Sequence, residues 1–156
     1  MVWAGVSQRG KTAIIFCEEG NKINAESYRE DILKVALPKM KRVFRGTPLV
    51  FQQDNAPSHR AKSTQDYLKE KVSDLIDSDR WPANSPDLNP MDYSVWGALK
   101  KKVYRSSSST TEDLKAAIVK EWRALSQDFI DNAILQWRKR LRLVIQQNDG
   151  HIEHLL

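Results

Sequence analysis

Short apolar runs separated by turn residues predict β-strands in the first half of the chain. Residues 2–6 and 12–16 are rich in β-branched and aromatic side chains, and the polar stretch 7–11 between them contains a glycine. This pattern is typical of a β-hairpin. The apolar run within residues 49–54 is short and unbroken, which indicates a buried strand with both faces covered. A weaker strand is predicted within residues 75–81.

Helical periodicity begins after this hairpin. Asn24 is the predicted N-cap of a first helix, and Pro38 interrupts its apolar pattern. Ser58 is the predicted N-cap of a second helix, which we expect to run to about Lys71. Beyond Pro90 we expect three more helices, at about 90–104, 111–125 and 127–147. This order of strands and helices predicts an α/β fold with a mixed sheet flanked by helices and a helical C-terminal part.

The composition fits a single globular domain spanning residues 1–156, since no repeat or internal boundary is visible. With 40% hydrophobic and 29% charged residues, the chain can bury a sizeable core and is neither disordered nor fibrous. No apolar run approaches the ~20 residues of a membrane span, and we expect neither a signal peptide nor a membrane partner. The single cysteine, Cys17, excludes an internal disulfide and a cysteine-based zinc site. This cysteine usage fits a reducing compartment inside the cell.

The positive charge of the chain is unevenly placed. Of the net +5, residues 1–91 carry +2, residues 92–145 carry +5 and the last eleven residues carry −2. The excess is what a surface that follows a phosphate backbone would carry. A well-solvated helical surface is the alternative interpretation.

Two acidic residues lie at positions where a ligand-binding or metal-binding site can form. Asp54 closes the buried strand, where an unpaired carboxylate is costly and where ligands of open α/β sheets bind. Asp92 lies at the predicted start of a helix, with 37 residues between the two acids. Two carboxylates without histidine or cysteine ligands favour Mg²⁺ or Mn²⁺, and a pair of such ions can cleave or transfer phosphodiesters. Alternatively, Asp54 only caps the next turn and Asp92 only interacts with the helix dipole.

The blocks around these acids resemble the two signature blocks of mariner-type DNA transposases. The first is Gln-Asp-Asn-Ala-Pro-Ser-His at residues 53–59, and the second is Trp-Pro-Ala-Asn-Ser-Pro-Asp-Leu-Asn-Pro-Met-Asp at residues 81–92. Residues 2–7 look like the second core strand of that family, and residues 96–100 and 150–154 are similar to its C-terminal part. The resemblance therefore covers essentially the whole chain.

The resemblance implies a ribonuclease H-like core with a triad of metal-binding acids. Asp54 corresponds to the second acid and Asp92 to the third, and an aspartate in third place is similar to the mariner branch. The implied cofactor is Mg²⁺ or Mn²⁺, and the implied reaction is hydrolysis at a transposon end followed by attack of the freed 3′-hydroxyl on target DNA. The implied partners are transposon-end and target DNA, with a homodimer in a synaptic complex, and the implied location is the nucleus.

The first acid of that triad has no counterpart among these residues. In the family it lies on a strand upstream of the block that residues 2–7 resemble, whereas Glu18 and Glu19 follow the second predicted strand. The family's helix-turn-helix DNA-binding domain has no counterpart either. We therefore expect an N-terminally truncated core that is marginally stable, exposes a sheet edge and is inactive alone. The alternatives are a relic or domesticated module that binds DNA without catalysis, and another nuclease or integrase of this superfold.

Further DNA-binding residues are expected near the acids. In the first block these are Asn55 and His59, for which an Asx turn and a structural role are the respective alternatives. A basic cluster follows the second block and consists of Lys100, Lys101, Lys102 and Arg105. These side chains can bind backbone phosphates without recognising the base sequence; the alternative is a solvated helix face. A second basic cluster spans residues 138–142. For Trp81 and Trp96, core packing is favoured over stacking on bases.

Overall fold

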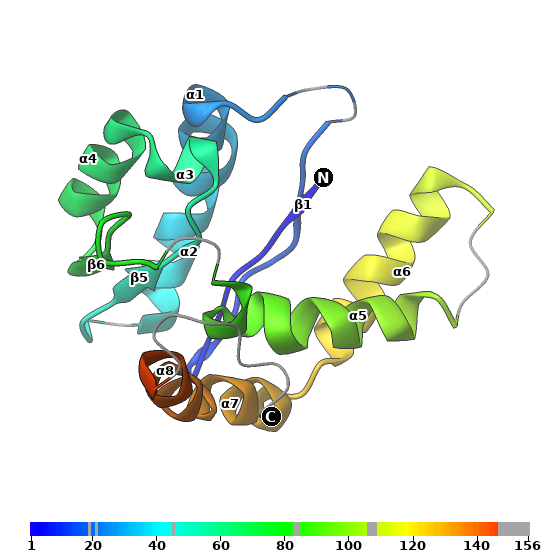
Figure 1. Cartoon of the computed structure of the whole chain (residues 1–156). Helices are drawn as coiled ribbons and strands as arrows, with labels where there is room; N and C mark the ends of the chain where they lie inside the picture. Colours follow the sequence, from blue (N-terminus) through cyan, green and yellow to red (C-terminus); the bar gives the residue numbers. More distant parts are fainter. Residues whose placement is uncertain (19, 21, 45, 83–84, 106–108, 147–156) are drawn as a thin grey trace. The chain divides into compact units, whose positions relative to one another are not determined.

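The computed structural model describes residues 1–18, 20, 22–44, 46–82, 85–105 and 109–146 (Figure 1). Within it the chain forms two compact units. Unit 1 comprises Met1–Gly5 and Arg9–Ser85, and unit 2 comprises Val6–Gln8 and Pro86–Leu156. The expectation of a single domain concerns the chain as a whole and stays a prediction.

The strands of unit 1 form an antiparallel and a parallel pair. β1 (Val2–Trp3) pairs antiparallel with β4 (Ile15–Phe16), which confirms the predicted hairpin with shorter strands. β5 (Val50–Gln52) pairs parallel with β6 (Asp74–Ile76), and the two lie side by side in Figure 1. Two further short strands lie within the hairpin: β2 (Val6–Ser7), which belongs to unit 2, and β3 (Gly10–Lys11). Among the described residues, each sheet has two strands. Parallel and antiparallel pairing, which we predicted for one mixed sheet, therefore occur in separate strand pairs.

The first helical segment begins as predicted and the second does not. The Asn24 side chain accepts hydrogen bonds from the backbone N–H groups of Glu26 and Ser27, which confirms Asn24 as an N-cap. Ser58 is not a cap, because the helix begins at Pro57, whose fixed φ suits the first helical position. The helical segments of unit 1 are α1 (Ala25–Ser27), η1 (Tyr28–Leu33, a π-helical turn), α2 (Lys34–Phe44), α3 (Pro57–Arg60) and α4 (Lys62–Lys71).

Two helix interruptions differ from the prediction. α2 continues through Pro38, because the buried side chains of Ala36 and Leu37 hold this turn against the core and outweigh the cost of the missing N–H. The helix expected from residue 58 to about residue 71 is divided at Ala61, where φ is −54° and ψ is 131°. This division leaves α3 as a single turn.

The core of unit 1 lies between its helices and both strand pairs. Its buried side chains come from η1, α2, α4, β5 and β6, and the partly buried Trp3 and Ile15 of the hairpin pack against them. This packing holds β5 against the helices and fixes the position of its carboxyl end. The buried residues are Tyr28, Ile32, Leu33, Leu37, Phe51, Leu68 and Leu75.

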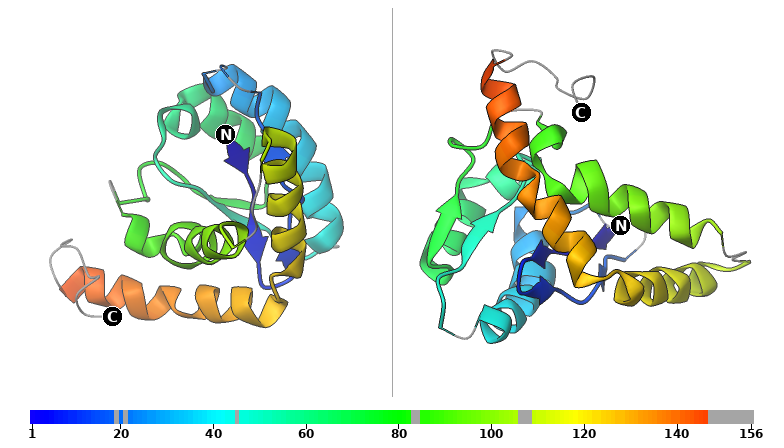
Figure 2. Two further views of the ribbon diagram at one scale, coloured as in Figure 1. Left: turned by 90° about the vertical axis from the view of Figure 1, so that its right-hand side faces the viewer. Right: turned by 90° about the horizontal axis from the view of Figure 1, so that it is seen from below.

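Unit 2 is mainly helical. The single helix expected at 127–147 is two helices that meet at Gln136 and follow one another along nearly one line (Figure 2). β2 lies against the first of these, where Gln127 Nε2 donates a hydrogen bond to the Ser7 carbonyl at 2.9 Å. The helical segments are η2 (Pro86–Leu88, a 3₁₀ turn), η3 (Met91–Val95, a π-helical turn), α5 (Trp96–Val103), α6 (Thr111–Ala124), α7 (Gln127–Leu135) and α8 (Trp137–Gln146).

Tryptophan packing and helix length agree with the expectations for unit 2. Trp96 stacks on the buried Trp122 with ring centroids 6.3 Å apart, as expected for core packing. In the described part of the chain, no helix has the length and apolar character needed to cross a bilayer. Residues 83–84 of the second signature block and residues 150–154 lie outside the described residues.

Candidate functional site

Asp54 lies just beyond the carboxyl end of β5, in unit 1. Its Oδ1 accepts a hydrogen bond from the Ala56 N–H at 3.1 Å and lies 2.6 Å from His59 Nδ1. The hydrogen bond from His59 is the main reason why the pKa of Asp54 is lower than usual, and the Ala56 N–H adds to it against the effect of burial. The side chain is 50% exposed, and all hydrogen bonds that the described residues give it go to Oδ1. The carboxylate is therefore ionised, with Oδ2 directed to no protein donor in that part of the chain.

His59 is held between Asp54 and Tyr28. The rings of His59 and Tyr28 have centroids 4.3 Å apart, and the Tyr28 hydroxyl donates to Gln53 Oε1 at 2.8 Å. Burial raises the pKa of Tyr28 well above its ordinary value, so this hydroxyl stays a donor at neutral pH. His59 thus orients the Asp54 carboxylate from a fixed position, and its predicted contact with DNA stays a prediction.

Asn55 fastens the loop that follows β6. Its Nδ2 donates to the carbonyl oxygens of Ser78 at 3.3 Å and Trp81 at 3.0 Å. The Asx turn considered for Asn55 is made by Asp54 instead, through the Ala56 N–H. Trp81 is 5% exposed, which confirms core packing and removes its face from stacking on bases. The predicted DNA contact of Asn55 stays a prediction.

Asp92 lies in the first turn of η3, in unit 2, as predicted. Asn89 Nδ2 donates to Asp92 Oδ2 at 2.7 Å, and Asn89 Oδ1 accepts from the Met91 N–H at 3.1 Å. One asparagine therefore both begins the helical turn and orients the carboxylate. Asp54 and Asp92 thus each receive a side-chain hydrogen bond from a residue of the same signature block.

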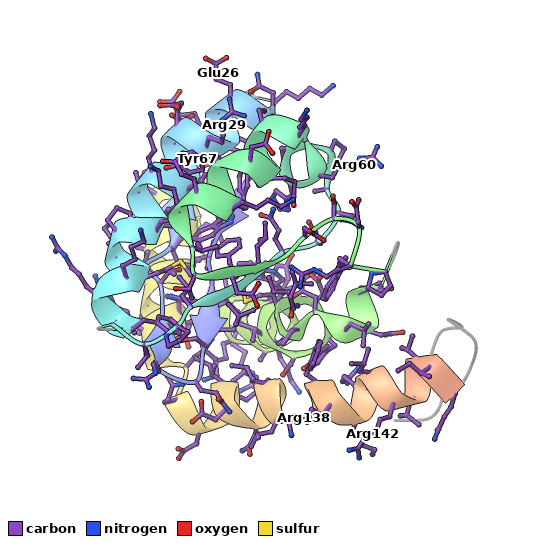
Figure 3. All side chains as sticks on the ribbon, turned by 90° about the vertical axis from the view of Figure 1, so that its left-hand side faces the viewer. Glu26, Arg29, Arg60, Tyr67, Arg138 and Arg142 are labelled. Atoms are coloured by element: carbon purple, nitrogen blue, oxygen red, sulfur yellow. The ribbon has the colours of Figure 1, made fainter. Side chains whose placement is uncertain are left out.

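The turn that carries Asp92 is fastened to the C-terminal helices. The Tyr93 hydroxyl donates to the Ala133 carbonyl at 2.6 Å, and the Arg140 guanidinium lies 3.7 Å from the centre of the Tyr93 ring. Arg140 Nη1 also donates to the Asp87 carbonyl at 3.3 Å. Arg140 is only 8% exposed, so it does not share the surface of the basic cluster 138–142. Arg138 and Arg142 do, and both project from α8 in Figure 3.

The donor chemistry of the two acids fits a hard divalent cation. Asp54 and Asp92 offer carboxylate oxygens, the ligands that Mg²⁺ and Mn²⁺ prefer. The residues that the structure describes contain no group of three or more His, Cys, Asp or Glu side chains that could hold a metal ion. Each unit supplies one acid of the predicted set.

Tyr104, at the C-cap of α5, adds an aromatic ring to the predicted basic cluster of Lys100, Lys101, Lys102 and Arg105. Lys100, Lys101 and Arg105 are exposed, whereas Lys102 is partly buried. Tyr104 is 75% exposed, with Lys100 Nζ 5.7 Å from its ring centre. The sequence signal for this residue is an aromatic side chain two positions after a run of lysines and directly before Arg105, and it was not among the predicted site residues. The role of the cluster in binding DNA stays a prediction.

The family of the chain follows from its sequence. Residues 1–115 match the profile of the family described as "DDE superfamily endonuclease", and the chain belongs to this family. It is 33% identical over 156 residues to the Tc3 transposase of Caenorhabditis elegans, covering 99% of this chain and 45% of that protein. It is 31% identical over 116 residues to the Tcb2 transposase of Caenorhabditis briggsae, covering 74% and 41%. The chain spans less than half the length of these relatives.

Solved structures confirm the predicted fold. The Mos1 transposase catalytic domain with raltegravir and Mg superposes with a TM-score of 0.81 at 23% identity, over 97% of this chain and 75% of that one. The crystal structure of the catalytic domain of Mos1 mariner transposase gives a TM-score of 0.75 at 20% identity, over 98% and 82%. The chain therefore has the ribonuclease H-like α/β fold expected from the resemblance.

Proposed function

We propose that this chain provides part of the catalytic core for DNA transposition, by metal-dependent cleavage of DNA strands at a transposon end and their transfer to target DNA. The observation that carries the proposal is the site of Asp54, an ionised carboxylate just beyond the carboxyl end of β5, oriented by His59 through one oxygen. Membership of the endonuclease family supports the reaction class.

In this proposal Asp54 and Asp92 are two ligands of Mg²⁺ or Mn²⁺. When bound, such ions activate an attacking hydroxyl and stabilise the leaving oxygen of a phosphodiester. The hydrogen bond from His59 keeps Asp54 ionised and oriented. The hydrogen bond from Asn89 orients the carboxylate of Asp92. Solved structures of the Mos1 catalytic domain with Mg and with Mn support the choice of cation.

DNA is the proposed partner. Mos1 has been solved as a paired-end complex with a transposon end, which supports transposon-end DNA as a ligand and two copies of the chain in a synaptic complex. In this chain the exposed cations Lys100, Lys101 and Arg105, with Lys102 beside them, would bind the phosphate backbone. Asn55 and His59 would lie where the DNA meets Asp54.

Metal affinity tests the proposal directly. We expect the chain to bind Mn²⁺, measured by electron paramagnetic resonance, and both Asp54→Asn and Asp92→Asn to lower the affinity at least about tenfold, because each removes a charged ligand. Asp66→Asn is the matched control, since Asp66 is exposed on α4 outside the signature blocks. Equal Mn²⁺ binding by all three variants would contradict the role of the two acids.

A second candidate function is DNA binding without catalysis. It is favoured by the observation that the described residues hold no group of three or more metal-ligating side chains. We expect the 156-residue chain on its own not to nick a transposon end. Mg²⁺-dependent nicking that disappears in Asp54→Asn would refute that expectation, whereas DNA binding without any Mn²⁺ affinity would favour the second candidate.

A further inference from the structure

The carbonyl oxygen of His59 accepts two side-chain amide hydrogen bonds at the end of α3. Gln65 Nε2 donates at 2.8 Å and Gln53 Nε2 at 3.2 Å. We call these two side chains, Gln53 and Gln65, the glutamine clamp. Among the described residues no backbone N–H reaches this oxygen, because the chain leaves helical geometry at Ala61. The clamp therefore supplies the hydrogen bonds that a continuous helix would have made.

The single turn of α3 needs such support. A helix of four residues is not stable by itself in water, because the free-energy cost of nucleating a helix exceeds the stabilisation that a single turn provides. Both members of the clamp are themselves fixed. Gln65 is 6% exposed and its Oε1 accepts from the Ser78 N–H at 3.3 Å, while Gln53 Oε1 accepts from the Tyr28 hydroxyl at 2.8 Å. The position of the His59 backbone is thus tied to the loop after β6, to η1 and to the end of β5.

The imidazole of the same residue contacts the proposed metal ligand. His59 Nδ1 lies 2.6 Å from Asp54 Oδ1, and the ring packs on Tyr28. Carboxylates that ligate metals are commonly oriented by hydrogen bonds, and loss of these outer partners lowers metal affinity about 10–100-fold. Anything that moves the His59 backbone is therefore transmitted to the orientation of the Asp54 carboxylate.

We infer that Gln53 and Gln65 are positioning residues for the metal site, which fix the His59 carbonyl so that its ring holds Asp54 in a ligating orientation. This inference rests on the proposed role of Asp54. A clamp that served only the stability of the fold would leave the His59–Asp54 hydrogen bond unchanged when one glutamine is replaced. The two roles differ in what happens at the imidazole.

Gln65→Met and Gln53→Met test the inference in the full 156-residue chain, since methionine keeps the length of the side chain and removes its amide. We expect the Mn²⁺ affinity to fall about tenfold in each variant, and the ring ¹⁵N signals of His59 to shift in the metal-free protein at fixed pH. These signals are assigned by their loss in His59→Gln. Gln52→Met on β5 is the matched control, because within the described part of the chain the Gln52 side chain makes no hydrogen bond, and it should change neither readout.

Unchanged His59 signals and unchanged Mn²⁺ affinity in folded clamp variants would overturn the inference, whatever their thermal stability. If Gln65→Met fails to fold, Gln53→Met decides alone, because Gln53 is only partly buried. If the unmodified chain binds no Mn²⁺, the proposed function fails, and the His59 signals still decide whether the clamp positions the ring.

Discussion

Arg140 lies buried in unit 2 although it stands in a run of basic residues. Its guanidinium lies over the face of Tyr93 and donates to the Asp87 carbonyl. A desolvated cation over an aromatic ring is stabilised by roughly 2 kcal/mol, which offsets part of the cost of burying the charge. Because Tyr93 follows Asp92 directly, this contact also fixes the turn that carries Asp92.

Substitutions of Tyr93 separate its ring from its hydroxyl. Tyr93→Phe removes the hydrogen bond to Ala133 and should lower the free energy of unfolding by about 1 kcal/mol. Tyr93→Leu also removes the aromatic face under Arg140 and should cost about 2–3 kcal/mol. Urea denaturation measures both. Tyr104→Leu is the control, since this exposed tyrosine should contribute less than about 0.5 kcal/mol; equal losses for Tyr93→Phe and Tyr93→Leu would contradict the role of the ring.

Sequence patterns predict local features of single residues better than their distant partners. Asp54 and Asp92 could be singled out because their blocks are contiguous and their positions at element ends follow from neighbouring residues. Arg140 was grouped with its exposed neighbours, because its burial depends on Tyr93, which is distant in the sequence. The clamp was missed for the same reason, since Gln65 acts on a carbonyl group that carries no residue-specific signal.

Pro38 lies inside α2, and the helix tolerates it because its buried face is well packed. The proline leaves the Lys34 carbonyl without its helical N–H partner. Pro38→Ala should restore that hydrogen bond on an exposed face and raise the free energy of unfolding by about 1 kcal/mol or more. Thermal unfolding checks this, with Lys39→Ala as the neighbouring exposed control. A destabilised Pro38→Ala would mean that the proline is matched to the π-helical turn before it.

The turn after β6 makes stability depend on pH. Asp77 Oδ1 accepts from the Arg80 N–H at 3.1 Å and from Arg80 Nε at 3.4 Å, and this backbone hydrogen bond is the main reason why the pKa of Asp77 is lowered. A lowered pKa stabilises the fold above the unfolded value of about 3.9, and this contribution is lost as the pH falls through the folded pKa.

Asp77→Asn should therefore lower the Tm by a few degrees at pH 7 and leave it nearly unchanged near pH 2, where the wild-type carboxyl is also neutral. Asp79→Asn, in the same turn, should show little effect at either pH. A difference between Asp77→Asn and the wild type that persists undiminished at the low pH would show that the charge of Asp77 is not the cause.

Elements whose signals lie in neighbouring residues could be predicted from the sequence, whereas elements that depend on tertiary packing could not. The hairpin and the cap at Asn24 depend on strand propensity and on side-chain oxygens next to the helix start, and both are confirmed. The start of α3 at Pro57 had a visible signal, because proline favours the first helical position. The break at Ala61 had none, since alanine is the best helix former and the break depends on where α3 and α4 pack.

The charge distribution of the whole chain predicts a salt-dependent affinity for DNA. Each phosphate contact contributes about −0.9 to the slope of log K against log salt concentration. Replacing Lys100, Lys101 and Arg105 by Gln should therefore make this slope less steep by about 2–3 in fluorescence anisotropy with duplex DNA. The matched control replaces three exposed cations of α2, Lys39, Lys41 and Arg42, and should leave the slope nearly unchanged. Equal effects of both triple variants would indicate a response to net charge alone.

The three residues Val6–Gln8 have a consequence for how the chain folds as it is made. They belong to unit 2, while the residues on both sides belong to unit 1, and Ser7 receives its hydrogen bond from Gln127, 120 positions later. Ribosomes add about 5–20 residues per second, and compact units generally fold as they emerge. Unit 1 can fold once residue 85 has left the exit tunnel, whereas the hydrogen bond between Gln127 and Ser7 must wait several seconds longer, until α7 has been made. Vectorial synthesis therefore gives the two units a fixed order of folding.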